Sequence, residues 1–213
     1  MGIGVKQIEL GPLANFIYLI ADPVARDCAV VDPAWDVPEI SKALAENGWN
    51  LSKIIITHNH PDHTNGVGRM LKAHDVPVYV HRADSYALRE FGKNVRSSES
   101  GDKIRIGALE ATLLHTPGHT EGSQCLWVED RLVSGDTLFI GGCGRVDLPN
   151  SDPEKMYRSL RKIATLPDKT LVFPGHHYAE ARCAPLLGEK GGNPYLKVSA
   201  TRGLEDFLSL VGM

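Results

Sequence analysis

Six consecutive residues, His58 to His63 (HNHPDH), constrain this 213-residue chain more than any other feature. They follow Lys53–Thr57 (KIIIT), an apolar run typical of a strand buried on both faces. In a loop after such a strand, the alternate residues His58 and His60 can point toward one ion, and Asp62 and His63 can turn toward a second. Zinc and similar ions bind imidazole nitrogen and carboxylate oxygen at about 2.0–2.2 Å. Four such side chains among six residues therefore predict a metal site at the end of a buried strand.

Three further loops carry ligand-type side chains, and each loop directly follows a predicted strand. His119 ends the segment HTPGH, Asp136 follows SG, and His176 lies in PGHHY. Each is weak evidence alone, because an Asp after a Gly commonly serves turn chemistry. Together they complete the set of metal ligands. Three imidazoles and a carboxylate make one site, and a shared carboxylate can bridge two cations. His176 then gives the second ion its remaining imidazole. Loops of this kind can converge at one edge of a sheet.

The order of the expected elements favours a layered α/β arrangement in which helices cover a sheet. The predicted strands are Asn15–Ala21, Cys28–Val31, Lys53–Thr57, Val76–His81, Lys103–Ile106, Leu109–Leu114, Ser123–Val128, Arg131–Ser134 and Leu171–Phe173. The predicted helices are Val37–Asn47, Val67–His74, a helix opened by Asp152 and reaching about Ile163, and Leu204–Val211. We expect Gly188–Asn193 to be a mobile connection. Because neither a repeat nor a domain linker is evident, we expect one domain over residues 1–213, with a short C-terminal helical extension.

The bulk composition narrows the classes of partner and compartment. The chain is 42% hydrophobic and 23% charged, which is ordinary for a globular protein. A net charge of −3 argues against nucleic acid or an anionic membrane surface as the main partner. The apolar runs are shorter than the roughly 18–20 residues that span a bilayer. Four scattered cysteines without a CxxC pair are typical of reduced thiols, which predicts a cytoplasmic protein.

Four motifs occur in a recognisable order: THNHPDH (57–63), HTPGH (115–119), SGDT (134–137) and PGHHY (174–178). This set resembles the metallo-β-lactamase-fold superfamily. The resemblance implies an αββα sandwich with the site at one edge of its two mixed sheets. It also implies two divalent metal ions, with zinc preferred over iron or manganese as the bound metal. Its ligand assignment is His58, His60 and His119 for the first metal, Asp62, His63 and His176 for the second, and Asp136 as a bridge.

Within that superfamily, GDTLFIGGCGR (135–145) and PGHHY are similar to glyoxalase II. The resemblance implies hydrolysis of a thioester by a metal-bridging hydroxide, with Asp62 and Asp136 as catalytic residues. It implies that Arg145 and Tyr178 contact a small-molecule substrate, glutathione or another thiol ester. A thiolate leaving group needs little help from a general acid, which suits a centre whose acid–base groups are metal ligands. The chain departs from the family at Asp147, where glyoxalase II has a second aromatic residue.

Two alternative functions remain open at this stage. GCGR-x-D (142–147) and NPYL (193–196) resemble persulfide dioxygenases, and this likeness implies a single iron held by His60, His119 and Asp136. The other alternative is a hydrolase of lactone, β-lactam or phosphodiester bonds. Bound metal distinguishes the first alternative from thioester hydrolysis, because two zinc ions favour hydrolysis and one iron favours oxygenation.

Several neighbours of the motifs admit simpler interpretations. Asp32 either orients an active-site histidine or forms a turn. We expect a structural role for His115, a position outside the ligand set for His177, loop packing for Cys143 and a surface position for His81.

Overall fold

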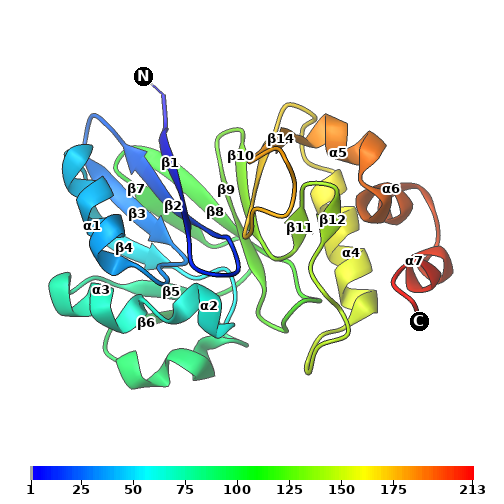
Figure 1. Ribbon diagram of the computed structural model, residues 1–213, viewed down its shortest axis with the longest axis horizontal. Helices are drawn as coiled ribbons and strands as arrows, with labels where there is room; N and C mark the ends of the chain where they lie inside the picture. Colours follow the sequence, from blue (N-terminus) through cyan, green and yellow to red (C-terminus); the bar gives the residue numbers. More distant parts are fainter. Residues whose placement is uncertain (1) are drawn as a thin grey trace.

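Two six-stranded mixed sheets form the centre of the computed structural model, which describes residues 2–213 (Figure 1). The first sheet has the order β1-β2-β3-β4-β5-β6, with antiparallel pairing up to β3 and parallel pairing beyond it. Its strands are β1 (Gly4–Leu10), β2 (Asn15–Asp22), β3 (Asp27–Val31), β4 (Asn50–Ile55), β5 (Val78–His81) and β6 (Val95–Ser98).

The second sheet has the order β14-β13-β10-β9-β8-β7, and only its β10–β13 pair is parallel. Its strands are β7 (Lys103–Ile106), β8 (Leu109–His115), β9 (Gln124–Val128), β10 (Arg131–Gly135), β13 (Leu171–Pro174) and β14 (Ala184–Pro185). A separate hairpin pairs β11 (Leu138–Phe139) with β12 (Gly142–Cys143).

Strand β2 shows why the sheets must be covered on both faces, because all eight of its residues are buried. Side chains alternate between the faces of a strand. The even-numbered residues Phe16, Tyr18 and Ile20 pack against the second sheet. The odd-numbered Ile17 and Leu19 pack on the other face with residues of helices α1 (Val37–Glu46) and α3 (Val67–Ala73). The two faces of one strand thus belong to two different hydrophobic cores.

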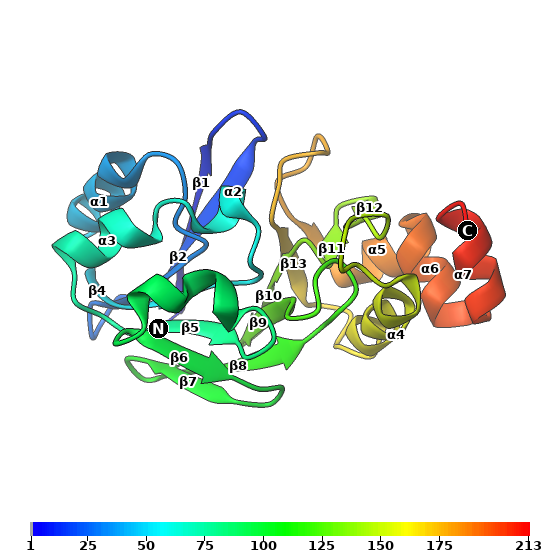
Figure 2. The same ribbon diagram turned by 90° about the horizontal axis from the view of Figure 1, so that it is seen from below.

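A third core covers the outer face of the second sheet. Helix α4 (Pro153–Ala164) contributes Met156 and Leu160 to it, and the C-terminal helices contribute Leu196 and Phe207. The C-terminal helices are α5 (Leu186–Gly192), α6 (Pro194–Thr201) and α7 (Leu204–Leu210), and Figure 2 shows them at the opposite end of the molecule from α1 and α3. The layers therefore run helix, sheet, sheet, helix, which confirms the predicted αββα sandwich.

The expected connection at Gly188–Asn193 is wrong, because most of this segment lies in helix α5. Its glycines disfavour a helix, but tertiary contacts outweigh that preference. The buried Glu189 carboxylate accepts hydrogen bonds from Gly141 N at 2.8 Å and from Asn193 Nδ2 at 3.0 Å. These contacts join the C-terminal helices to the β11–β12 hairpin.

His81 also differs from expectation, because it is buried rather than on the surface. Only 4% of His81 is exposed, and its ring stacks on the ring of His115 with centroids 3.8 Å apart. Burial of the ring, and then the neighbouring His115, lower the pKa of His81 to about 4. Within residues 2–213, the helices are too short or too polar to cross a membrane.

Candidate metal centre

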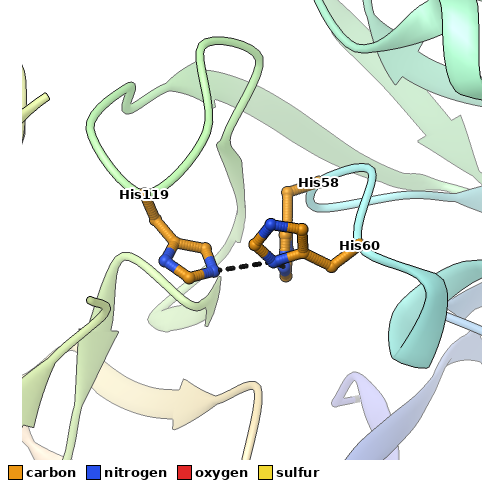
Figure 3. A group of neighbouring side chains, drawn as sticks. All are labelled: His58, His60 and His119. Atoms are coloured by element: carbon orange, nitrogen blue, oxygen red, sulfur yellow. Dashed lines mark hydrogen bonds between the residues drawn. The ribbon is translucent and has the colours of Figure 1, made fainter. Parts of the chain in front are cut away.

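Three imidazoles from two loops converge beside the sheet edge (Figure 3). His58 and His60 follow β4, and His119 follows β8. His60 Nδ1 lies 3.1 Å from His58 Nε2 and 3.0 Å from His119 Nε2. Three nitrogens bound tetrahedrally to one zinc ion would lie about 3.3 Å apart. These three residues, called the first cluster below, therefore have nearly the spacing that one cation requires.

A second group lies beside the first and comes from two other segments. Pro61 occupies the first turn of the short helix α2 (Pro61–Thr64), which also carries Asp62 and His63. His176 follows β13. His63 Nε2 lies 3.1 Å from His176 Nε2, and Asp62 Oδ2 lies 3.4 Å and 3.5 Å from these two nitrogens. Asp62, His63 and His176 form the second cluster.

Asp136 connects the two clusters. Its Oδ2 lies 3.5 Å from His119 Nε2 of the first cluster and 3.3 Å from His176 Nε2 of the second. Its Oδ1 is buried and accepts no hydrogen bond within residues 2–213. The nearest charged group is His63 Nε2 at 3.5 Å, too far for a good hydrogen bond. A buried ionised oxygen without a hydrogen bond is costly, and a bound cation can compensate it. This atom is the strongest sign that the donor set fits metal ions.

Two glycines allow the chain to approach Asp136 this closely. A Cβ at Gly175 would lie 2.2 Å from Asp136 Oδ1, and a Cβ at Gly144 would fall even closer to the Asp136 carbonyl oxygen. A larger residue at Gly175 would therefore displace the carboxylate, and one at Gly144 would displace the backbone of Asp136. The glycines of PGHHY and GGCGR have a steric role in the centre that the sequence motifs alone did not reveal.

Hydrogen bonds on the outer side of the rings set their tautomers. The acceptors are Arg145 O for His119 at 2.9 Å, Leu13 O for His176 at 2.9 Å and Asp32 Oδ2 for His63 at 3.0 Å. These oxygens can only accept, so each ring donates from Nδ1. In the neutral ring the lone pair is thus on Nε2, which is the atom that faces the centre in all three rings.

His58 reaches the same tautomer through a relay. The Thr57 hydroxyl donates to Asp32 Oδ2 at 2.5 Å, so its oxygen is left to accept from His58 Nδ1 at 3.0 Å. Asp32 therefore acts on both His63 and His58. Its backbone has φ +51°, a left-handed conformation that Asp tolerates better than most residues. Both interpretations of Asp32 are thus met, because it forms a turn and orients a histidine.

The two clusters differ in their electrostatics. Burial and the neighbouring imidazoles lower the pKa of His58 well below its usual value, and the pKa of His60 is lowered for the same reasons. Burial also opposes a charge on His63, but the Asp136, Asp32 and Asp62 carboxylates raise its pKa well above the usual range. The pKa of His176 is raised by Asp136 against the same effect of burial.

The two carboxylates remain ionised despite their burial. Burial raises the pKa of Asp62, but His63 and the Asn15 side chain together hold it below the usual range. The pKa of Asp136 is lowered by His63 and His176 against a strong opposing effect of burial. In the first cluster, His58 and His60 thus present neutral imidazoles, whereas the second cluster presents a carboxylate together with histidines that favour the protonated form when no cation is bound.

The seven predicted ligand residues all lie in this one centre, as parts of the two clusters and the residue between them. The predicted substrate contacts lie close by. The Tyr178 ring stacks on His176 with centroids 4.7 Å apart, and 60% of Tyr178 is exposed. The Arg145 guanidinium is exposed and donates to both carboxylate oxygens of Asp147, at 2.9 Å and 2.8 Å.

Three neighbours of the motifs lie outside the centre. His115 Nε2 lies 2.9 Å from Glu121 O, and His177 Nδ1 lies 2.9 Å from Glu9 Oε2. Cys143 packs in the β11–β12 hairpin, where burial raises the pKa of its thiol to about 12.

Sequence reasoning missed the role of Asn15, which it placed only at the start of a strand. Asn15 Nδ2 donates to Asp62 Oδ2 at 2.9 Å, and Asn15 Oδ1 accepts from Trp35 Nε1 at 2.9 Å. These partners lie 47 and 20 residues away along the chain. A local motif carries no sign of such a contact.

A cavity of about 700 Å³ opens beside His60. Its lining is largely polar and includes Asn59, Tyr86, Glu121 and Lys155. The cavity shares His60 with the first cluster, so a small molecule bound there would lie against the centre.

Comparisons with known proteins support the interpretation of this centre as a metal site. The sequence model of the Metallo-beta-lactamase superfamily matches residues 10–176. The chain is 43% identical over 167 residues to a hydroxyacylglutathione hydrolase of Alkalilimnicola ehrlichii, covering 78% of this chain and 63% of that protein, which is less than two thirds of its length. It is 34% identical to the probable polyketide biosynthesis zinc-dependent hydrolase BaeB of Bacillus velezensis, over 78% of this chain and 75% of that protein. The crystal structure of ETHE1 from Myxococcus xanthus is similar with a TM-score of 0.85 and 30% identity, covering 98% of this chain and 89% of that one.

Proposed function

This chain belongs to the metallo-beta-lactamase superfamily, and we propose that it is a metal-dependent thioester hydrolase with two cations at the centre described above. One observation carries the proposal. Asp136 lies between two groups of three ligand atoms, and its buried Oδ1 accepts no hydrogen bond from the described residues. We assign the first cluster to one cation, the second cluster to the other, and Asp136 to both.

The cations would supply a nucleophile near neutral pH, by lowering the pKa of water, and a charge that stabilises the oxyanion. The protein's own residues perform the remaining tasks. Asp62 and Asp136 stay ionised and balance the positive charge of the cations, and the outer hydrogen bonds of His58, His63, His119 and His176 keep four Nε2 atoms directed inward. With these groups committed as ligands, a thiolate suits the centre as leaving group, because it departs without a strong general acid.

We assign the substrate a position between the cavity beside His60 and the exposed ring of Tyr178. The cavity takes the acyl part, and Tyr178 and Arg145 contact the thiol part. The name hydroxyacylglutathione hydrolase of the Alkalilimnicola ehrlichii relative supports a glutathione thioester as the first substrate to test. The Asp147 carboxylate competes with the thiol part for the Arg145 guanidinium, so any ionic contact between Arg145 and the substrate is weak.

Zinc is the metal that we propose, because imidazole nitrogen and carboxylate oxygen suit it and the BaeB relative is named a zinc-dependent hydrolase. Four cysteines, all free, support a reducing compartment such as the cytoplasm. A small molecule is the expected partner, since the described cavity beside the centre is the size of a ligand pocket.

The deciding experiment measures bound zinc, iron and manganese in protein purified without added metal, together with thiol release from an S-acyl glutathione under nitrogen. We expect two zinc ions per chain and thiol release that does not need oxygen. One iron per chain with oxygen uptake on glutathione persulfide would overturn the proposal in favour of a dioxygenase.

Adjacent histidines provide a matched control for this experiment. His176→Ala removes a ligand of the second cluster, so it should lower the metal content to about one per chain and abolish thiol release. His177→Ala changes the next residue, whose ring contacts Glu9, and should keep both metals. Equal metal loss in the two variants would argue against the assigned second cluster.

A further inference from the structure

Asp84 is a buried carboxylate that lies outside the two clusters. It precedes η1 (Ser85–Phe91), and only 1% of it is exposed. Its Oδ2 accepts from Asn59 N at 2.9 Å and from Thr120 Oγ1 at 2.7 Å, and its Oδ1 accepts from Gly122 N at 2.9 Å. The burial of a charge is costly unless it is hydrogen-bonded, and these three donors offset part of that cost, although burial still raises the pKa of Asp84.

The donors belong to the two loops that build the first cluster. Asn59 stands between His58 and His60, and Thr120 directly follows His119. Figure 3 shows these loops facing each other across the three rings. The Asp84 carboxylate therefore connects the backbone of the loop that carries His60 to the backbone of the loop that carries His119.

The loop at Gly122 is shaped for this contact. A Cβ at Gly122 would lie 2.4 Å from Asp84 Cγ, so only glycine allows its backbone N–H to approach the carboxylate. Thr120 is held from a second direction as well, because its hydroxyl lies 2.8 Å from Ser123 Oγ. The ring nitrogens themselves are oriented by other groups, so Asp84 acts on the spacing of the loops rather than on the tautomers.

We propose that Asp84 is a positioning residue that fixes the distance between the His58–His60 loop and the His119 loop, and thereby sets the affinity of the first cluster for its cation. The inference rests on the proposed function in one respect, namely that the first cluster binds a cation. Metal sites require their ligands to be held within about 0.5 Å of the bound geometry, and loss of such support costs about 10–100-fold in affinity.

The test is the affinity of each cation, measured for zinc by competition with a chromophoric chelator on the full chain. Asp84→Asn keeps the shape but replaces an acceptor oxygen by a donor NH2 that faces donors. We expect a 10–100-fold weaker first zinc and a second zinc within about twofold of the wild type. Unchanged affinity for both zinc ions would overturn the proposal.

Two variants of Thr120 keep the proposal testable if Asp84→Asn folds poorly. Thr120→Val removes the hydroxyl and retains the shape, so it should weaken the first zinc several-fold, with an effect below that of Asp84→Asn. Thr120→Ser retains the hydroxyl and should bind like the wild type. If Val and Ser at this position give the same affinity, the hydrogen bond to Asp84 has no role in binding.

Asp22 offers a matched control at the other end of the strands. It is also buried, and it accepts from Val24 N, Ala25 N and Ala108 N, which join two turns. Asp22→Asn should lower the melting temperature and leave both zinc affinities unchanged. If it weakens the first zinc as much as Asp84→Asn does, the effect is global and the proposal is wrong. A wild type that binds two zinc ions without cleaving thioesters would contradict the proposed function and leave this inference intact.

Discussion

Asp136 alone separates the two clusters in space, but the clusters differ in the chemistry of their side chains. The first cluster consists of three imidazoles, and the pKa values of His58 and His60 are lowered by burial and by the neighbouring rings. The second cluster includes a carboxylate, and the pKa values of His63 and His176 are raised by surrounding acids. Without metal, His58 and His60 therefore favour the neutral form that binds a cation, whereas His63 and His176 favour the protonated form.

One centre can thus combine a site that binds a cation directly with a site where the cation must first displace protons. The cause lies in the carboxylates around each ring. Asp136 raises the pKa values of both His63 and His176, and the Asp32 carboxylate at the outer nitrogen of His63 adds to this effect. The outer nitrogens of His58 and His119 contact only a hydroxyl and a backbone carbonyl. A carboxylate stabilises a charged imidazolium far more than a carbonyl does. Cation uptake at the second cluster should therefore be the step that depends on pH.

The largest expected effect comes from the residue that the clusters share. Asp136→Ala removes an oxygen from each cation, so we expect metal content to fall and thiol release to drop by about 1,000-fold. Elemental analysis and a thioester assay on the same preparation check this. Asp168→Ala, which removes an exposed carboxylate paired with Lys190, is the control. Full activity of Asp136→Ala would show that the clusters do not depend on a bridge.

The pH dependence of metal binding comes next. The pKa of His63 is raised, so its proton stabilises the metal-free protein below the unfolded value of about 6.5, and this contribution is lost as the pH rises through the folded pKa. The pKa of His58 is lowered, so its neutral ring favours the folded state above about 6.5, and this contribution is lost as the pH falls. Acidification should therefore release the second cation first. Metal content after dialysis between about pH 8 and pH 5 measures the order, and simultaneous loss of both cations would remove the distinction.

Asp32 and Thr57 allow the support of the two clusters to be changed to different degrees, because Asp32 contacts His63 directly and acts on His58 only through Thr57. Asp32→Asn keeps the left-handed backbone, which Asn tolerates, but weakens the acceptor of His63, so the second cation should bind about 10–100-fold more weakly. Thr57→Val removes the acceptor of His58 together with a donor to Asp32, and should weaken the first cation by about 10-fold, which is more than it weakens the second. Thr57→Ser is the control. Chelator competition gives both affinities, and equal effects on both cations in each variant would contradict this difference in support.

The sequence predicted the parts of the molecule that depend on local patterns. The buried strands β2, β3 and β10 have the expected apolar residues, and the ligand motifs come directly after strands. The strand β1 was missed because its residues are only partly buried, and its pairing with β2 is what stabilises it. The strand β6 and the helix α6 were also missed, because they too depend on tertiary contacts.

The supporting residues of the centre could not be predicted for a different reason. Asp84 and Asn15 have no motif around them, and their partners are 20 to 47 residues away along the chain. Asn193 is similar, because its side chain donates to Phe139 O and Gly142 O of the hairpin, 54 and 51 residues away. Ligands can be recognised from residue type and spacing, whereas the residues that hold them are defined by the folded backbone alone.

The smallest expected effect separates the side chain of Arg145 from its backbone. The carbonyl of Arg145 supports His119 in the first cluster, and Arg145→Ala leaves that contact in place. An exposed ionic contact is worth about 1 kcal/mol or less, so KM for a glutathione thioester should rise by about fivefold or less. The value of kcat and the affinities of both cations should stay unchanged. Asp147→Ala releases the guanidinium from its partner and should shift KM in the opposite direction. Steady-state kinetics on the two variants checks this, and a lower kcat for Arg145→Ala would place its side chain in the chemical step rather than in substrate binding.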